Sequence, residues 1–159
     1  MFRRLFFPFS VLRGPGLELR LRERTTWDRR QGIAETITYD ICPDGVSCAG
    51  YVSLRLGESP ELYYLGHIGY RVEEPFRGRG LAARSVQALL PLIASEGMRS
   101  LSITTDVDNF ASRRTCENLG CVLENIVRVP RRYSALCMNS PAKCRYILLM
   151  DEQTGKETS

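Results

Sequence analysis

The sequence contains few of the residues from which metal sites and nucleic-acid surfaces are built. Its 159 residues include one histidine, His67, and six cysteines without a C-x-x-C pair, which excludes a zinc site of familiar spacing. Lys143 and Lys156 are the only lysines, and the formal charge of +4 comes from scattered arginines. A nucleic-acid-binding protein usually clusters basic residues among aromatic ones. We therefore expect no metal and no nucleic-acid partner, whereas a mild positive charge suits an anionic small molecule.

The chain also lacks internal repeats, low-complexity tracts and any apolar segment long enough to span a membrane. Its length and its hydrophobic content of 43% predict one domain with its own core. Residues 5–12 are mostly apolar, but Pro8 interrupts them and no small-x-small cleavage site follows, so a surface extension is favoured over a signal peptide. We assign residues 1–16 to an N-terminal extension, 17–151 to the domain and 152–159 to a polar tail. We expect a cytoplasmic protein with reduced thiols.

Hydrophobic patterning predicts the order of the elements. Four strands are expected in the first half of the chain, at 17–23, 35–42, 49–57 and 62–72. The second half is expected to contain a helix at 80–97, a strand at 99–105, a helix at 108–120 and strands at 121–129 and 144–150. Short turns make the early strands antiparallel, and a helical crossover makes the fourth and fifth strands parallel. This order predicts an α+β domain with a mixed, mostly antiparallel sheet of about seven strands and flanking helices.

The segment "EEPFRGRGLAA", residues 73–83, predicts an anion site. Glycine lets a ligand approach the backbone closely, and the first amides of the following helix are unpaired at the positive end of its dipole. Arg77 and Arg79 add charged donors. These features suit a phosphate group.

A dinucleotide is one ligand that fits this loop. Gly78, Gly80 and Ala83 match the fingerprint G-x-G-x-x-A, and Asp106 follows at about the expected distance, which would indicate an NAD(P)-dependent enzyme. The context argues against it, because a proline-containing segment separates the loop from its strand and the preceding strands look antiparallel.

Coenzyme A is the other ligand, and two motifs favour it. "RGRGLA" (77–82) resembles the pyrophosphate loop of the GNAT acetyltransferase superfamily, [Q/R]-x-x-G-x-[G/A], and "DNFASRRTCENLG" (108–120) resembles its second signature. "GHIGYRVEEPFRGRG" (66–80) is similar to a group of small bacterial members. The resemblance runs from about residue 17 to residue 150. It implies a sheet splayed between the fourth and fifth strands, and an acetyl-CoA-dependent N-acetyltransferase without a metal.

The resemblance also implies which residues hold acetyl-CoA. Backbone amides of Tyr70 and Val72, on the fourth strand, would pair with the pantetheine arm. The loop residues that would contact the pyrophosphate are Arg77, Gly78, Arg79, Gly80, Leu81 and Ala82. Asn109 would hydrogen-bond the pantetheine, cap its helix, or do both, and Ser112 would pack against the cofactor.

The chemistry that the resemblance implies is direct attack of a primary amine on the thioester in a ternary complex, with backbone amides near Tyr70 steadying the developing oxyanion. His67 is the candidate base, since histidine titrates near neutrality and relatives often carry the base on this strand. Alternatively, His67 has a structural role, and an ordered water acts as the base. Cys116 stands where relatives often have the tyrosine that protonates the leaving thiolate. Cys116 is therefore the candidate acid. Alternatively, Cys116 is a small apolar residue of the core, and Tyr133 acts as the acid.

The acceptor amine stays open. In the superfamily it is usually bound by two segments. One lies between the first two strands, here the short 24–34 with Trp27, and the other is a late loop, here residues 130–143 between the last two strands. A small-molecule amine and a protein amine are both expected acceptors, and a homodimer is an option. The missing tyrosine leaves a second function open, a GNAT-fold module that binds an acyl-CoA without turnover.

Overall fold

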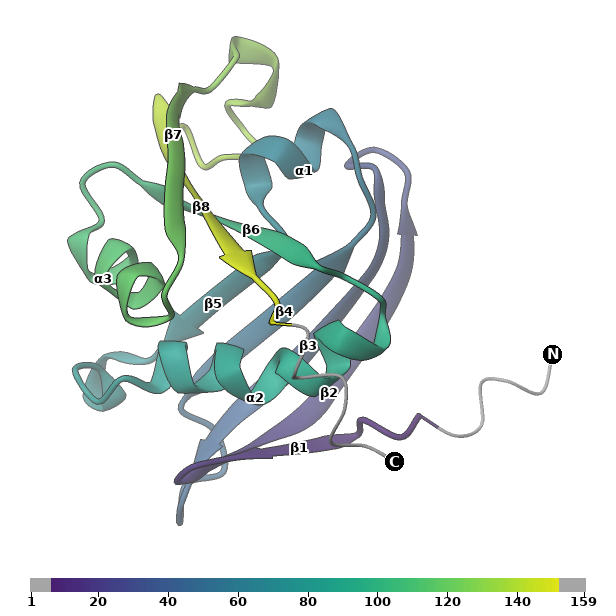
Figure 1. Cartoon of the computed structure of the whole chain (residues 1–159), viewed down its shortest axis with the longest axis vertical. Helices are drawn as coiled ribbons and strands as arrows, with labels where there is room; N and C mark the ends of the chain where they lie inside the picture. Colours follow the sequence, from purple (N-terminus) through teal and green to yellow (C-terminus); the bar gives the residue numbers. More distant parts are fainter. Residues whose placement is uncertain (1–6, 152–159) are drawn as a thin grey trace, which may run out of the picture.

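The computed structural model describes residues 7–151, in which a single sheet is flanked by helices (Figure 1). The sheet has eight strands in the order β1-β2-β3-β4-β5-β6-β8-β7. The strands are β1 (Val11–Gly14), β2 (Leu17–Asp28), β3 (Ile33–Pro43), β4 (Gly50–Leu56), β5 (Ile68–Val72), β6 (Ser100–Asp106), β7 (Val122–Arg128) and β8 (Ala142–Leu149). The helices are α1 (Pro60–Leu65), α2 (Leu81–Ser95) and α3 (Phe110–Asn118), with 3-10 turns at Glu74–Phe76 and Arg131–Tyr133.

The strand pairing confirms the predicted α+β fold. Neighbouring strands are antiparallel except β5 and β6, which run parallel and pair only at Ile68 and Ile103. β5 stays paired with β4 along its whole length, so its other edge is open beyond Ile68. β5 and β6 correspond to the fourth and fifth predicted strands, and the sheet is splayed between them as expected.

The additional strand, β1, comes from the segment assigned to the N-terminal extension. Residues 11–14 pair with residues 17–20 across a tight turn, and Leu12 and Leu17 are both buried. The boundary placed after residue 16 therefore falls inside the sheet, because this segment adds an apolar residue to the core. Residues 1–6 and the predicted tail at 152–159 lie outside the described residues.

The strand predicted at 62–72 is wrong in its first part, where residues 60–65 form α1. Ser59 caps this helix by accepting a hydrogen bond from the Leu62 amide at 3.1 Å, and Pro60 occupies its first turn. Gly66, with φ of +81°, ends the helix and redirects the chain into β5. The aromatic residues favoured a strand, but the cap and the terminating glycine decide the local structure.

The segment 24–34, expected as a connection between the first two predicted strands, mostly continues them instead. β2 extends to Asp28 and β3 begins at Ile33, so only a short turn separates them. Trp27, near the end of this long hairpin, is 72% exposed. The hairpin places the exposed end of the segment at the rim of the sheet.

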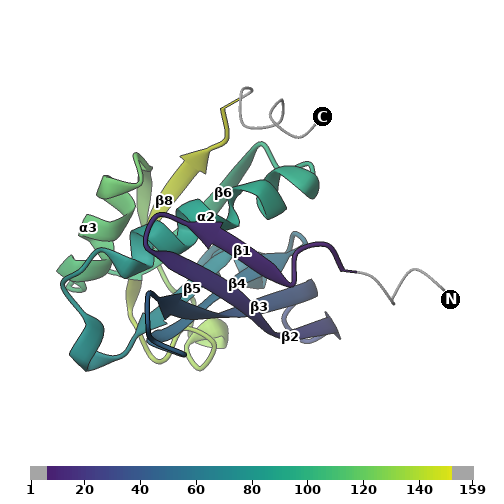
Figure 2. The same ribbon diagram turned by 90° about the horizontal axis from the view of Figure 1, so that it is seen from below.

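Helix α2 crosses β1 to β5 and covers their core face (Figure 2). Its buried residues recur at helical spacing: Leu81, Ser85, Val86, Ala88, Leu89, Leu92 and Ile93. Pro91 lies inside the helix, and Gly97, with φ of +72°, follows its C-terminus as predicted. This packing fixes the N-terminus of α2 at the open end of β5. None of the described helices has the length and apolar character that crossing a membrane requires.

Candidate functional site

The glycine loop between β5 and α2 has the geometry of an anion site. Gly78 and Gly80 have φ of +79° and +69°, which glycine adopts without strain, and a Cβ at either position would meet no atom within 4 Å. Within the described residues, the amides of Gly78, Arg79 and Gly80 donate to no other backbone group. The first amides of α2 also lack partners inside the helix. The loop therefore offers a row of donors beside open space.

Hydrogen bonds tie this loop to the elements on either side. The 3-10 turn at Glu74–Phe76 ends with the Arg77 amide donating to the Glu74 carbonyl at 3.2 Å. The Arg77 side chain then donates from Nε to the Val72 carbonyl at 2.9 Å, at the end of β5. Arg84, in the first turn of α2, donates to the Arg79 carbonyl at 3.0 Å. The conformation of the glycine loop is therefore stabilised by the segments directly before and after it in the sequence.

A cavity of about 590 Å³ lies beside this loop, and we call it the loop cavity. Nine of the ten residues predicted to hold acetyl-CoA line it: Tyr70, Val72, Arg77, Gly78, Gly80, Leu81, Ala82, Asn109 and Ser112. The tenth, Arg79, is not among the lining residues, and its guanidinium lies 5.8 Å from the centroid of the Phe76 ring.

The lining also includes residues of α3 that sequence reasoning missed: Ala111, Arg114, Thr115 and Asn118. They are three, four and seven positions apart, so they share one helix face, and this spacing was the signal that could have revealed them. Arg71, Arg77 and Arg114 line the cavity, and no carboxylate does. Three cations without an anion suit a ligand with several phosphate charges.

The open edge of β5 also faces this region. The Glu73 amide donates to the Ala49 carbonyl on the β4 side at 2.8 Å. Because amide directions alternate along a strand, those of Tyr70 and Val72 point to the opposite, open side. The pairing with pantetheine expected for these two residues therefore has donors available.

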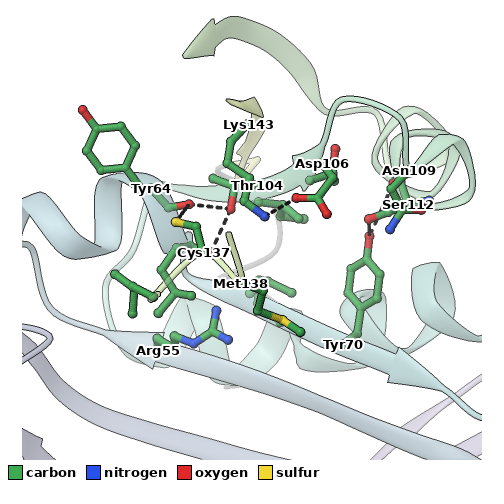
Figure 3. A pocket seen from close by; sticks show the side chains of 16 residues that line it. Arg55, Tyr64, Tyr70, Thr104, Asp106, Asn109, Ser112, Cys137, Met138 and Lys143 are labelled. Carbon is green, nitrogen blue, oxygen red and sulfur yellow. Dashed lines mark hydrogen bonds and ion pairs between the residues drawn. The ribbon is translucent and has the colours of Figure 1, made fainter. Parts of the chain in front are cut away.

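A second cavity, of about 250 Å³, lies on the other side of Tyr70, and we call it the α1 cavity (Figure 3). Its walls come from β4, β5, α1, β6, residues 136–138 of the late loop, and β8. Tyr70, Asn109 and Ser112 line both cavities. The two cavities therefore meet in the splay of the sheet.

The α1 cavity holds an ion pair and a separate arginine. The Lys143 ammonium donates to the Asp106 carboxylate. Burial raises the pKa of Asp106, but hydrogen bonds from Lys143 and Ser140 outweigh burial and hold the pKa below its ordinary value. Arg55 donates to the Gly66 carbonyl at 3.1 Å.

Asp106 therefore does not serve the glycine loop, as the dinucleotide interpretation requires. It lines the α1 cavity and is absent from the lining of the loop cavity. A dinucleotide fold also needs a parallel doubly wound sheet, whereas β5 and β6 are the only parallel pair among the described strands. The NAD(P) alternative does not fit this fold.

Tyr70 and Ser112 form a hydroxyl pair where the cavities meet (Figure 3). The Tyr70 Oη lies 2.7 Å from the Ser112 Oγ. Burial raises the pKa of Tyr70, so its hydroxyl stays protonated at neutral pH. Asn109 accepts a hydrogen bond from the Ser112 amide at 3.1 Å, so it caps α3 while also lining both cavities.

The two predicted catalytic residues line neither cavity. His67 is 7% exposed; its Nδ1 accepts from the Ser102 amide at 3.0 Å, and its Nε2 lies 3.2 Å from Glu58 Oε1. Cys116 is fully buried in α3, where a hydrogen bond with Cys121 and burial raise the pKa of its thiol. These contacts favour the structural alternatives for both residues.

The substitute acid considered from the sequence, Tyr133, is also absent from both linings. Its ring packs 5.3 Å from the ring of Tyr64, which anchors the late loop to α1. The loop therefore closes one wall of the α1 cavity through packing.

Comparisons with known proteins identify the family to which this chain belongs. The family model described as "Acetyltransferase (GNAT) domain" matches residues 15–122. A comparison with curated protein sequences finds no match. Among solved structures, RimL, described as a ribosomal L7/L12 alpha-N-protein acetyltransferase, is 27% identical in its crystal form 2, with a TM-score of 0.56 over 73% of this chain and 70% of that chain.

Two further structures show the same fold. RimL in complex with coenzyme A is 20% identical, with a TM-score of 0.63 over 89% of this chain and 98% of that chain. MccE, a microcin C7 self-immunity acetyltransferase in complex with acetyl-CoA and AMP, is 21% identical, with a TM-score of 0.56 over 72% of this chain. This chain spans 61% of the length of MccE. With a family match over more than half of its length, the chain belongs to the GNAT acetyltransferases.

Proposed function

We propose that the protein is an acetyl-CoA-dependent N-acetyltransferase that acts by direct attack of a primary amine in a ternary complex. One observation carries the proposal: a cavity lined by arginines and unpaired loop amides meets a second cavity at Tyr70, inside the splay of the sheet. Family membership supports acetyl-CoA as the cosubstrate. The coenzyme A and acetyl-CoA named for the RimL and MccE structures support the same ligand.

The loop cavity is the proposed site for acetyl-CoA. The amides of residues 78–82 and the positive end of α2 would bind the pyrophosphate, with Arg77 and Arg114 offsetting its charge. The amides of Tyr70 and Val72 would pair with the pantetheine arm. The bound thioester supplies an activated acetyl group at the junction of the cavities.

The Tyr70–Ser112 hydroxyl pair, which was not predicted from the sequence, is proposed to lie next to the leaving sulfur. As the amine nitrogen bonds the acetyl carbon and the carbon–sulfur bond breaks, negative charge develops on sulfur. A buried neutral hydroxyl can donate a hydrogen bond to that charge. Because its pKa is raised by burial, Tyr70 would stabilise the thiolate as a donor without giving up its proton.

The amine is proposed to react without a dedicated side-chain base. Arg55 and Lys143 line the α1 cavity against a single carboxylate, Asp106. Positive surroundings lower the pKa of an ammonium group, so the neutral amine is favoured there. Asp106 is a weak base because its pKa is lowered. Water is therefore the proposed proton acceptor in place of His67.

The proposed classes of acceptor are supported by a structural neighbour and not by the cavities themselves. RimL is described as acetylating the α-amino group of a ribosomal protein, which supports a protein or peptide amine here alongside a small-molecule amine. The edge strand β7 exposes Val122, Leu123 and Ile126, which supports the homodimer. A cytoplasmic location stays a prediction.

Thermal unfolding with acetyl-CoA, coenzyme A and NAD tests the cosubstrate. A ligand at about 100 times its dissociation constant adds about 2.7 kcal/mol to the free energy of unfolding. We expect a shift with both coenzyme A ligands and its loss in Gly80→Glu, because the new carboxylate would occupy the loop and repel phosphate. Gly97→Glu is the matched control: it adds the same side chain at a similar positive φ, at the opposite end of α2.

A thermal shift with NAD alone, or the absence of a shift with every ligand, would contradict the proposal. The alternative of an acyl-CoA-binding module without turnover has one observation in its favour, the buried thiol at the position where relatives often have tyrosine. A screen of amines with acetyl-CoA separates the two functions. Ligand-dependent stabilisation without acetylation of any amine would favour the module.

A further inference from the structure

The partly buried Arg55 differs from three other arginines of the sheet. Arg22, Arg24 and Arg145 each pair with a carboxylate. Within residues 7–151, Arg55 forms no ion pair; its one hydrogen bond goes to the Gly66 carbonyl at 3.1 Å. A guanidinium has five N–H donors, so most of those of Arg55 stay available. A partly buried charge without a counter-ion is unfavourable, and a bound anion would relieve it.

The position of this guanidinium is set by a glycine. A Cβ added at Gly69 would lie 2.5 Å from the Arg55 Nη2, so a side chain at that position would displace the arginine. Gly69 directly precedes Tyr70, whose hydroxyl lies where the two cavities meet. Figure 3 shows the guanidinium directed from β4 toward the cavity, with the Lys143–Asp106 pair on its opposite side. Arg55 and Tyr70 both line the α1 cavity, so an anion on Arg55 would lie in the cavity that meets the proposed acetyl-CoA site.

The charge balance leaves Arg55 as the unmatched group. Lys143 and Asp106 neutralise each other, so the lining of the α1 cavity keeps one positive charge. A ligand that brings a single negative charge would complete the balance. The reacting amine itself brings none, so the anion must be a second group on the acceptor.

The size of the α1 cavity limits the ligand that it can hold. The volume of about 250 Å³ lies below the roughly 300–1,000 Å³ of drug-sized pockets, which restricts the bound group to a small one.

We propose that the α1 cavity selects amines that carry a carboxylate within a few bonds of the nitrogen, with Arg55 as the carboxylate receptor. The planar guanidinium matches a carboxylate through two parallel hydrogen bonds. Free amino acids and peptides that begin with Asp or Glu share this chemistry. The inference rests on the proposed acetyltransferase function.

Matched acceptor pairs test it. In one arm, β-alanine is compared with β-alaninamide; in the other, a C-terminally amidated peptide beginning with Asp is compared with one beginning with Asn. With kcat/KM expressed per neutral amine, we expect the carboxylate member of at least one pair to be favoured on the order of 10- to 100-fold. Arg55→Gln should bring this ratio close to one, and Arg55→Lys should keep part of it. The arm that shows the preference identifies the source of the carboxylate.

Controls separate this inference from the proposed function. The same amines are titrated calorimetrically into the protein saturated with coenzyme A, so a preference is measured even where turnover is slow. Arg13→Gln, which removes an exposed guanidinium from β1, should keep the wild-type ratio. A wild-type ratio near one in both arms, or an unchanged ratio in Arg55→Gln, overturns the inference. Absence of stabilisation by acetyl-CoA would instead overturn the proposed function.

Discussion

The loop cavity and the α1 cavity share Tyr70, Asn109 and Ser112 but are built in different ways. The loop cavity is made mainly from one contiguous segment, the end of β5 with the glycine loop, and from one face of α3. Its donors include backbone amides. The α1 cavity takes side chains from β4, α1, β6, the late loop and β8. A site made of backbone is sensitive to bulk at its glycines, whereas a site made of side chains can change its ligand through one substitution.

Tyr70→Phe is the change with the largest expected effect, because Tyr70 belongs to both cavities. Removing one donor to a developing charge typically costs 10²–10³-fold in kcat, so we expect a fall of about 100-fold with little change in the thermal shift by acetyl-CoA. Steady-state kinetics measures the first and thermal unfolding the second. Tyr133→Phe, at a nearly buried tyrosine that lines neither cavity, is the control. An unchanged kcat in Tyr70→Phe, with a loss in Cys116→Ala, would restore Cys116 as the acid.

His67→Ala tests a residue that belongs to neither cavity but closes the paired end of the splay. The His67 amide donates to the Ser102 carbonyl, and the His67 Nδ1 accepts from the Ser102 amide. The variant leaves the Ser102 donor buried and unpaired, so the free energy of unfolding should fall by about 1–3 kcal/mol. Urea unfolding measures this loss.

The pH dependence of kcat/KM separates this structural role from catalysis. We expect the folded His67→Ala variant to keep the wild-type profile. His67→Asn, whose side-chain oxygen can accept from the Ser102 amide, should recover part of the stability. A profile that loses an inflection near neutrality in both variants, while stability is unchanged, would identify His67 as the base.

The loop cavity is built mainly from contiguous segments, and this explains why most of its residues could be predicted from the sequence. The glycine loop, Asn109 and Ser112 lie in two contiguous motifs, and local geometry is enough to bring them beside one cavity. The order of strands predicted the splay because a crossover between antiparallel strands leaves one parallel pair. Arg114 was missed although its spacing from Ala111 was visible in the sequence.

The α1 cavity could not be predicted in the same way. Arg55 and Lys143 lie on strands far apart in the sequence, and their roles depend on which carboxylates the fold places beside them. The strand predicted over 62–72 misses α1, because the cap at Ser59 competes with an apolar and aromatic run that favours β-structure. The assignments of His67 and Cys116 came from positions in relatives, and burial in this chain places both side chains away from the cavities.

Lys143→Met has the smallest expected effect and tests whether the two cavities are separate. The pKa of Asp106 is lowered in the folded protein, so its pair with Lys143 adds stability above the unfolded pKa of about 3.9, and this stability is lost as the pH falls through the folded pKa. The Asp106 side chain is 45% exposed, so solvent screening keeps the contribution at pH 7 below about 1 kcal/mol.

Urea unfolding of both proteins from pH 7 down to pH 3 should show a gap in stability that closes below about pH 4, where the Asp106 carboxyl is protonated in the unfolded state and increasingly in the folded one. Lys143→Arg keeps the charge and should keep most of the pH dependence. A gap that does not change with pH would mean that Lys143 contributes packing instead of charge. If Lys143→Met also weakens stabilisation by acetyl-CoA, the cavities are coupled through β6, because Lys143 lines only the α1 cavity.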